Sequence, residues 1–184
     1  MTNKYMYFIA NWKMFGDLRT LNSLDRVIKF SKNNNNSKFR IIYCPPNTLI
    51  RPLSKRLIKT NLKVIFCIGE TLSEKRKKLT KKVLAKQINN GLKSIKDTSN
   101  IIIAYEPVWS IGTGLIPKSK DLLNSISYIK SKFRRKIPKV LYGGSVNNKN
   151  ITELKDINII DGFLIGGASQ NSKKFIDIIK KTFN

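Results

Sequence analysis

The sequence of 184 residues contains no histidine, so no site within it can use an imidazole as a general acid or base. Its two cysteines, Cys44 and Cys67, form no CxxC pair, which gives no disulfide framework and no metal site. Each cysteine ends an apolar run, so we expect both thiols to be buried. No apolar run approaches the roughly 18 residues that cross a bilayer, and the short run 5–10 is followed at once by Asn11 and Lys13. We therefore expect a cytoplasmic chain with no signal peptide, membrane partner, metal or cofactor.

Acidic residues are scarce, with 11 Asp and Glu against 36 Lys and Arg and a net charge of +25. Such an excess of positive charge is typical of proteins that bind nucleic acids or membranes. Alternatively, the excess of positive charge reflects a bias toward Lys, Asn and Ile, which an AT-rich genome produces. The basic clusters fall on separate predicted helices, and the aromatic residues do not interleave with them as stacking platforms would. We therefore expect no nucleic-acid partner, and a positive field that attracts small anions.

Short apolar runs alternate with helical patterns along the whole chain. The runs are rich in Ile, Val, Phe or Tyr, which is typical of buried parallel strands, and they occupy residues 5–11, 40–44, 63–68, 101–106, 139–142 and 162–165. Between them, apolar residues recur at spacings of three and four, which predicts amphipathic helices around Leu24, Ile88, Ile126 and Ile178. The alternation predicts one α/β domain over residues 1–184, with about six parallel βα units and right-handed crossovers.

Glycines and prolines follow the carboxyl ends of these runs, at the edge that carries the site in α/β folds. Glu106 ends the fourth run, and the following loop closes with Gly112-Thr113-Gly114. A carboxylate there is placed to take a proton; alternatively it is an exposed loop acid beside a turn-forming proline. The first run ends with Asn11 and Lys13, which share a face because strand side chains alternate. The alternative for Lys13 is an ordinary surface lysine in a lysine-rich chain.

Paired glycines follow the last two runs, at 143–144 and at 166–167. Glycine lets backbone N–H groups approach a phosphate closely, because no Cβ intervenes. A helical turn opening at Ala168 adds further N–H donors. One glycine pair by itself only marks a tight turn, but two pairs at neighbouring strand ends predict a phosphate site.

Four stretches together resemble the triosephosphate isomerase family: residues 10–13, 104–114, 142–146 and 161–168. The resemblance implies a (β/α)8 TIM barrel that interconverts dihydroxyacetone phosphate and D-glyceraldehyde 3-phosphate in glycolysis and gluconeogenesis, through enediolate proton transfer. It implies that Glu106 is the base, that Lys13 neutralises the anionic substrate and that Asn11 lines the pocket. It also implies that the backbones of Gly112, Ser145 and Gly167 bind the phosphate, with Gly166 as the turn. The stretch 67–70 matches the family too, but no catalytic role follows for its glutamate, Glu70.

The resemblance also implies a gap. Residues 1–50 match the first two βα units, and residues 55–184 match the end of the fourth helix and everything after it. The third and fourth strands are absent, which predicts an internal deletion near residues 50–55 and an incomplete barrel. The family's electrophilic histidine belongs to the absent fourth strand, and its homodimer contact uses the absent third loop. Two functions follow: an isomerase of impaired activity, or a non-catalytic remnant or incomplete gene product that retains a phosphate-binding half-site.

Overall fold

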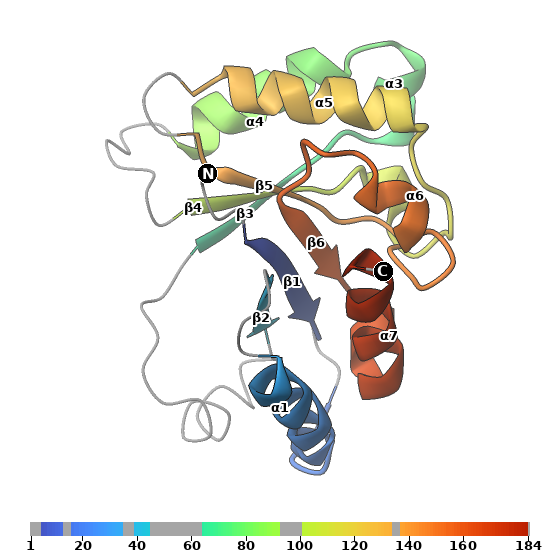
Figure 1. The fold of residues 1–184 in the computed structure, drawn as a ribbon. Helices are drawn as coiled ribbons and strands as arrows, with labels where there is room; N and C mark the ends of the chain where they lie inside the picture. Colours follow the sequence, from blue (N-terminus) through green and yellow to red (C-terminus); the bar gives the residue numbers. More distant parts are fainter. Residues whose placement is uncertain are drawn as a thin grey trace.

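A computed structural model describes residues 5–12, 16–34, 39–44, 64–92, 101–133 and 137–183. Its core is one parallel six-stranded sheet in the order β2-β1-β6-β5-β4-β3 (Figure 1). The strands are β1 Met6–Asn11, β2 Phe39–Cys44, β3 Val64–Ile68, β4 Ile101–Tyr105, β5 Lys139–Tyr142 and β6 Gly162–Ile165. The six predicted strands and their parallel pairing are therefore confirmed, with differences of about one residue at the ends. The predicted join near residues 50–55 lies outside the described residues.

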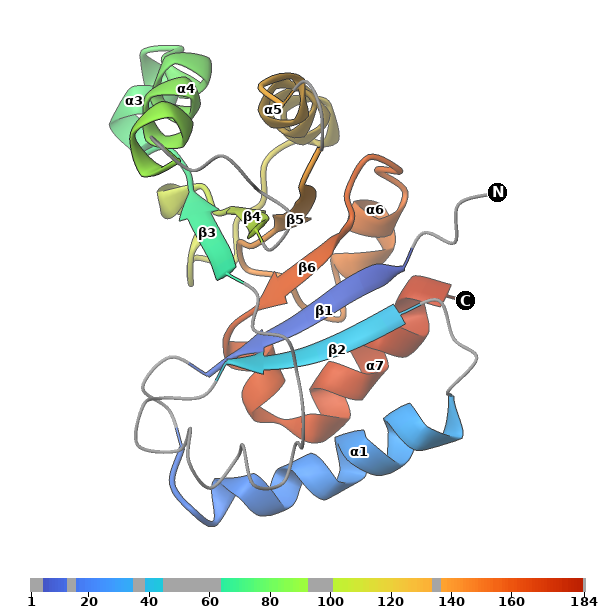
Figure 2. The ribbon, with the colours of Figure 1, turned by 90° about the vertical axis from the view of Figure 1, so that its left-hand side faces the viewer.

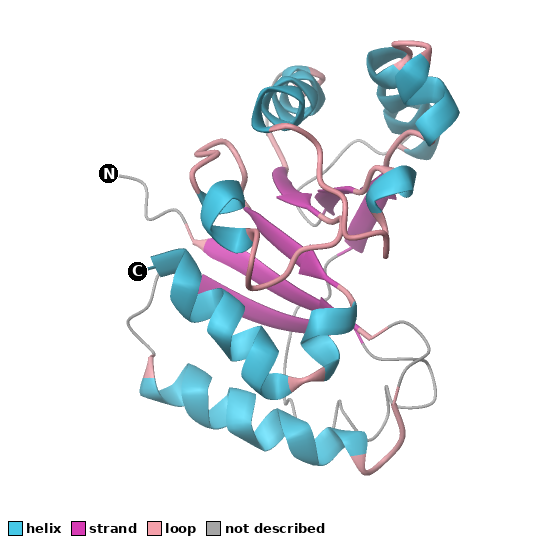
Figure 3. Cartoon of the chain, turned by 90° about the vertical axis from the view of Figure 1, so that its right-hand side faces the viewer, coloured by secondary structure: helices cyan, strands magenta, loops and turns pink. Residues whose placement is uncertain are grey.

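Helices cover the convex side of this curled sheet (Figure 2). They are α1 Leu24–Asn33, α3 Leu72–Arg76, α4 Thr80–Gly91, α5 Ser119–Ser131, α6 Ile151–Lys155 and α7 Ser172–Phe183, with short 3-10 turns η1 Thr20–Ser23, η2 Val108–Ser110 and η3 Gly167–Gln170. In Figure 3, α7 and α1 run across the outer face of the sheet. Asn171 caps the start of α7, because its side-chain oxygen accepts the Lys174 N–H at 3.0 Å. No helix in the described part of the chain is long and apolar enough to cross a membrane.

Both faces of the sheet are apolar, and strand alternation divides the core into two clusters. Phe8 and Ala10 of β1 belong to the large cluster that the helices cover, together with Phe175 and Ile178 of α7. Ile9, between them, belongs to the inner cluster, which also holds Ile102, Ala104, Leu141 and Leu164. Because successive side chains point to opposite faces, an apolar run without alternation predicts a strand buried on both faces. This arrangement is that of a barrel wall.

The barrel is open. Among the described strands, β2 and β3 lie at opposite ends of the sheet, and each pairs on one side only. This confirms the expectation of an incomplete barrel, since six strands of this curvature stop short of closure.

The expectation that Cys67 is buried is wrong. Cys67 is exposed, whereas Cys44 is half-buried and packs against the inner cluster. Cys67 shares the concave face of edge strand β3 with Ile65, because both are odd-numbered residues of one strand. A closed barrel would cover that position with side chains of a neighbouring strand, and the open edge leaves it accessible.

Candidate active site

Parallel strands bring the predicted site residues to one rim of the sheet, at their carboxyl ends. Asn11 closes β1, Glu106 follows β4, and the two glycine pairs follow β5 and β6. The indole N–H of Trp12 donates to the carbonyl oxygen of Ser169 at 3.3 Å, which ties the end of β1 to the loop after β6. Lys13 lies outside the described residues.

Glu106 lies directly against Gly143. A Cβ added to Gly143 would stand 2.7 Å from Glu106 Cγ and 3.0 Å from its Oε1. Real Cβ atoms do not approach other atoms this closely, so a glycine is required at 143 for Glu106 to take this position. Sequence reasoning gave this glycine only a phosphate-binding role and missed that it makes room for the carboxylate.

The backbone of Glu106 is held from both sides. Its N–H donates to the carbonyl oxygen of Ile68 at 2.8 Å, and the N–H of Gly143 donates to the carbonyl oxygen of Tyr105 at 2.9 Å. Gly69 also permits a close approach, because an added Cβ would overlap the carbonyl oxygen of Glu106. The half-buried carboxylate is thus carried by a fixed stretch of main chain between β3 and β5.

Glu70 anchors the start of the loop that follows Glu106. Its side chain is 1% exposed. Its carboxylate accepts the indole N–H of Trp109 at 3.0 Å and the hydroxyl of Tyr105 at 3.0 Å, while its carbonyl oxygen accepts the N–H of Val108 at 2.9 Å. Sequence reasoning assigned Glu70 no role. The sequence did offer an indication of this role, because the indole N–H of Trp109 and the hydroxyl of Tyr105 need a hydrogen-bond acceptor when they are buried.

Ser145 anchors the other end of that loop. Its hydroxyl donates to the carbonyl oxygen of Ser110 at 2.7 Å and accepts the N–H of Gly114 at 2.9 Å. Gly112 and Gly114 have φ values of 72° and 79°, a region that favours glycine. We call residues 107–117 the lid. It is fastened at its start by Glu70 and near its end by Ser145.

A pair of hydroxyl groups joins the lid to the end of β5. Ser110 Oγ and Tyr142 Oη are 3.0 Å apart, and both residues are buried. Burial raises the pKa of Tyr142 well above its usual range, the hydrogen bond to Ser110 partly offsets this, and the nearby carboxylates of Glu106 and Glu70 raise it further. Tyr142 is therefore a neutral hydroxyl at physiological pH.

The second glycine pair leaves open space. A Cβ added to Gly166 or Gly167 would meet no atom of the described residues within 4 Å, and Gly167 opens η3. The N–H and hydroxyl of Ser169 both bond the carbonyl oxygen of Gly166, at 2.9 and 2.7 Å, which folds the turn. Room for an anion therefore exists beside this backbone.

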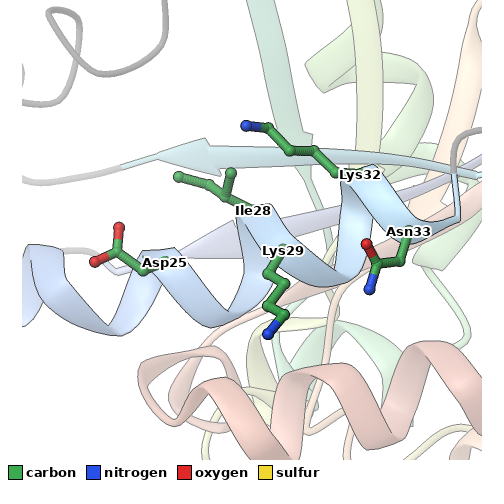
Figure 4. A pocket seen from close by; sticks show the side chains of 5 residues that line it. All are labelled: Asp25, Ile28, Lys29, Lys32 and Asn33. Carbon is green, nitrogen blue, oxygen red and sulfur yellow. The ribbon is translucent and has the colours of Figure 1, made fainter.

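The outer surface offers a different depression, of about 310 Å³, on α1. It is lined by Asp25, Ile28, Lys29, Lys32 and Asn33, and Figure 4 shows these side chains spreading to different sides of the helix. None of the predicted site residues lines it. Among the described residues, no three His, Cys, Asp or Glu side chains gather as a metal site would require.

Comparison with known proteins decides the family. The sequence model of triosephosphate isomerase matches residues 50–182. The chain belongs to the triosephosphate isomerase family. The triosephosphate isomerase of Candida albicans is 42% identical over 151 residues, and that of Debaryomyces hansenii is 40% identical over 151 residues. Each match covers 78% of this chain and 60% of the relative, so the chain matches about three fifths of these relatives' length.

Solved structures agree on the fold. A crystal structure of triosephosphate isomerase from Bartonella henselae superposes with a TM-score of 0.81 at 23% identity, covering 97% of this chain and 99% of that one. The resemblance seen in the sequence and the incomplete TIM-barrel fold are thus confirmed. Within the described parts of this chain, the rim places Glu106 against Gly143 and joins Ser145 to the lid that contains Gly112.

Proposed function

We propose that this chain binds a phosphorylated triose at the rim of the sheet and interconverts dihydroxyacetone phosphate and D-glyceraldehyde 3-phosphate at an impaired rate. The observation that carries the proposal is the position of Glu106, a half-buried carboxylate fitted against Gly143 at the foot of a lid. Family membership supplies the reaction. The fixed main chain around Glu106 supplies the positioning that proton abstraction needs.

Each predicted residue has a distinct part in this proposal. Glu106 removes the carbon-bound proton, Lys13 neutralises the anionic substrate, and Asn11 lines the pocket. The backbone N–H groups of Gly112, Ser145 and Gly167 bind the phosphate, with Gly166 forming the turn beneath it. The lid excludes water from the enediolate, which strengthens the electrostatic contacts and prevents loss of phosphate.

The impaired rate in this proposal follows from the amino-acid composition of the chain. The chain has no histidine, so no imidazole polarises the carbonyl or moves protons between the two oxygens. Loss of one positioned donor to a developing oxyanion costs a factor of about 10²–10³ in kcat. The exposed concave face beside Cys67 adds to this loss, because water reaches the site from the side of the open edge.

A second function is a non-catalytic remnant or incomplete gene product that binds phosphate without turnover. The observation that favours it is the chain's coverage of only 60% of the length of its relatives. A coupled isomerase assay on the purified chain, run beside a titration with glycerol 3-phosphate, separates the two. Turnover that depends on Glu106 supports the isomerase, whereas binding without any turnover supports the remnant.

Assembly and location complete the proposal. The family's homodimer contact uses a loop that has no counterpart in the sequence, so we infer that self-association is weakened. The positive net charge of +25 adds repulsion between copies, which salt screens. We infer a location in the reducing cytoplasm from the proposed glycolytic role, in keeping with two cysteines that form no CxxC pair.

A further inference from the structure

Lys75 stands over the lid's tryptophan. Its Nζ lies 4.0 Å from the ring centroid of Trp109, within the range of a cation–π contact. The same ammonium lies 3.6 Å from the carboxylate of Asp121 in the first turn of α5. The indole is therefore held on its face by a cation and at its edge by the buried carboxylate of Glu70.

The position of Lys75 is built into a capped helix. The Thr71 hydroxyl accepts the N–H of Glu74 at 3.3 Å, and the Glu74 carboxylate accepts the N–H of Thr71 at 2.8 Å, which makes a reciprocal capping box for α3. The N–H of Lys75 then donates to the carbonyl oxygen of Thr71 at 3.0 Å. With its side chain only 32% exposed, Lys75 differs from the freely solvated lysines of this basic surface.

We infer that Lys75 is a positioning residue for the lid: from α3 it fixes the orientation of Trp109, and thereby the docking of the lid on Ser145. The inference rests on the proposed function only in assigning the lid a part in binding a phosphorylated triose. Trp109 is linked to the docked Gly114 through Thr113, whose hydroxyl donates to the carbonyl oxygen of Trp109 at 3.1 Å, so a change in the orientation of the indole is transmitted to the docked end of the lid. Any lid movement that turns the indole must break the contacts with Glu70 and Lys75 together.

Two substitutions of Lys75 test this. Lys75→Gln removes the cation and keeps a polar side chain, whereas Lys75→Arg keeps a cation that stacks on aromatic faces. Lys132→Gln is the matched control, because Lys132 makes the same kind of contact over the ring of Tyr128 at 4.3 Å, away from the lid. Asp121→Asn removes the carboxylate beside Lys75 and should act in the same direction as Lys75→Gln, with a smaller effect.

The first measurement uses the ligand-free protein. With 5-fluorotryptophan incorporated, the chain gives two ¹⁹F resonances, and the resonance of buried Trp12 serves as an internal reference. Lys75→Gln should shift or broaden only the Trp109 resonance. It should also speed amide exchange at Gly114 by about two- to fivefold, the size of one exposed cation–π contact. Lys75→Arg should restore both signals, and Lys132→Gln should change neither.

The second measurement adds glycerol 3-phosphate. Lys75→Gln should weaken its binding by about two- to fivefold, since the undocked lid withdraws Gly112, and Lys75→Arg should bind as the parent chain does. Unchanged exchange at Gly114 in Lys75→Gln, or an equal change in Lys132→Gln, would overturn the inference. If glycerol 3-phosphate binds to no variant, the proposed function fails, while the ligand-free signals still decide the role of Lys75.

Discussion

The carboxylate side chain of Glu106 and the missing side chain of Gly143 occupy adjoining space. A Cβ on residue 143 would lie 2.7 Å from Glu106 Cγ, closer than van der Waals contact allows. This relationship joins the end of β4 to the end of β5 at the side chain that we propose takes the proton. Substitution of Gly143 therefore tests whether Glu106 acts from the position that it has in the structure.

Gly143→Ala should displace Glu106 while the fold persists, because the nearest atoms belong to a side chain that can rotate. We expect residual isomerase activity to fall by about 10²-fold, since a displacement near 1 Å in a reacting group costs that much. A coupled assay on the purified variant measures it. The control is binding of glycerol 3-phosphate, which Gly143→Ala should leave nearly unchanged, because the atoms nearest to the added Cβ all belong to Glu106. A loss of binding as large as the loss of activity would mean that Gly143 acts in some other way.

Glu70→Ala should destabilise the chain by about 2–3 kcal/mol, the cost of leaving a buried donor without its acceptor. The hydroxyl of Tyr105, a residue 2% exposed, loses the carboxylate to which it donates, and so does the indole N–H of Trp109. Urea denaturation followed by circular dichroism measures the change. Glu70→Gln, which keeps an acceptor oxygen in place, should cost less. Equal losses in the two variants would indicate that the charge of Glu70, and not its hydrogen bonds, holds the lid.

Ser145→Ala should weaken binding of glycerol 3-phosphate by about fivefold, the value of one neutral hydrogen bond. The hydroxyl joins Ser110 to Gly114, so its removal loosens the lid without removing the backbone N–H groups of the cradle. Titration followed by amide chemical shifts measures the affinity. Ser131→Ala is the control, because Ser131 Oγ donates within α5, to the carbonyl oxygen of Tyr128 at 2.7 Å.

Gly167→Asp should abolish the same binding, because it fills the open space beside the phosphate with bulk and negative charge. The parent chain's affinity should fall as salt rises, since a basic surface attracts anions through a field that salt screens. Retained binding in this variant would remove Gly167 from the site.

Alkaline pH should destabilise the fold. Burial raises the pKa of Tyr142 and of Tyr105 well above the ordinary value of 10.0. The folded chain then binds protons that the unfolded chain releases, so the free energy of unfolding declines as pH rises above about 10. Urea denaturation between pH 8 and about 11 measures this slope. Lysine deprotonation acts in the same range, so the comparison with Tyr142→Phe isolates the tyrosine contribution, and that variant should show a shallower decline.

The strands could be predicted from the sequence because a strand buried on both faces leaves an unbroken apolar run, as at 101–105 and 140–142. The positions of the rim residues could also be predicted, because the carboxyl ends of parallel strands lie at the same edge of a sheet. Features that depend on distant partners could not be predicted. Glu70 contacts Trp109, which lies 39 residues away in the sequence. Cys67 is exposed on β3, which among the described strands pairs on one side only, with β4. The functional roles of all the described site residues stay predictions: Asn11, Glu106, Gly112, Ser145, Gly166 and Gly167. Lys13 lies outside the described residues.

The central claim is that Glu106 still abstracts a proton in a chain without an imidazole. The direct measurement is a coupled isomerase assay on the purified chain and on Glu106→Gln, both prepared in a host whose own isomerase has been deleted. We predict a parent rate at least about a thousandfold below that of a full-length relative, and no detectable rate in Glu106→Gln. A parent rate equal to that of a full-length relative, or activity that survives Glu106→Gln, would contradict the account.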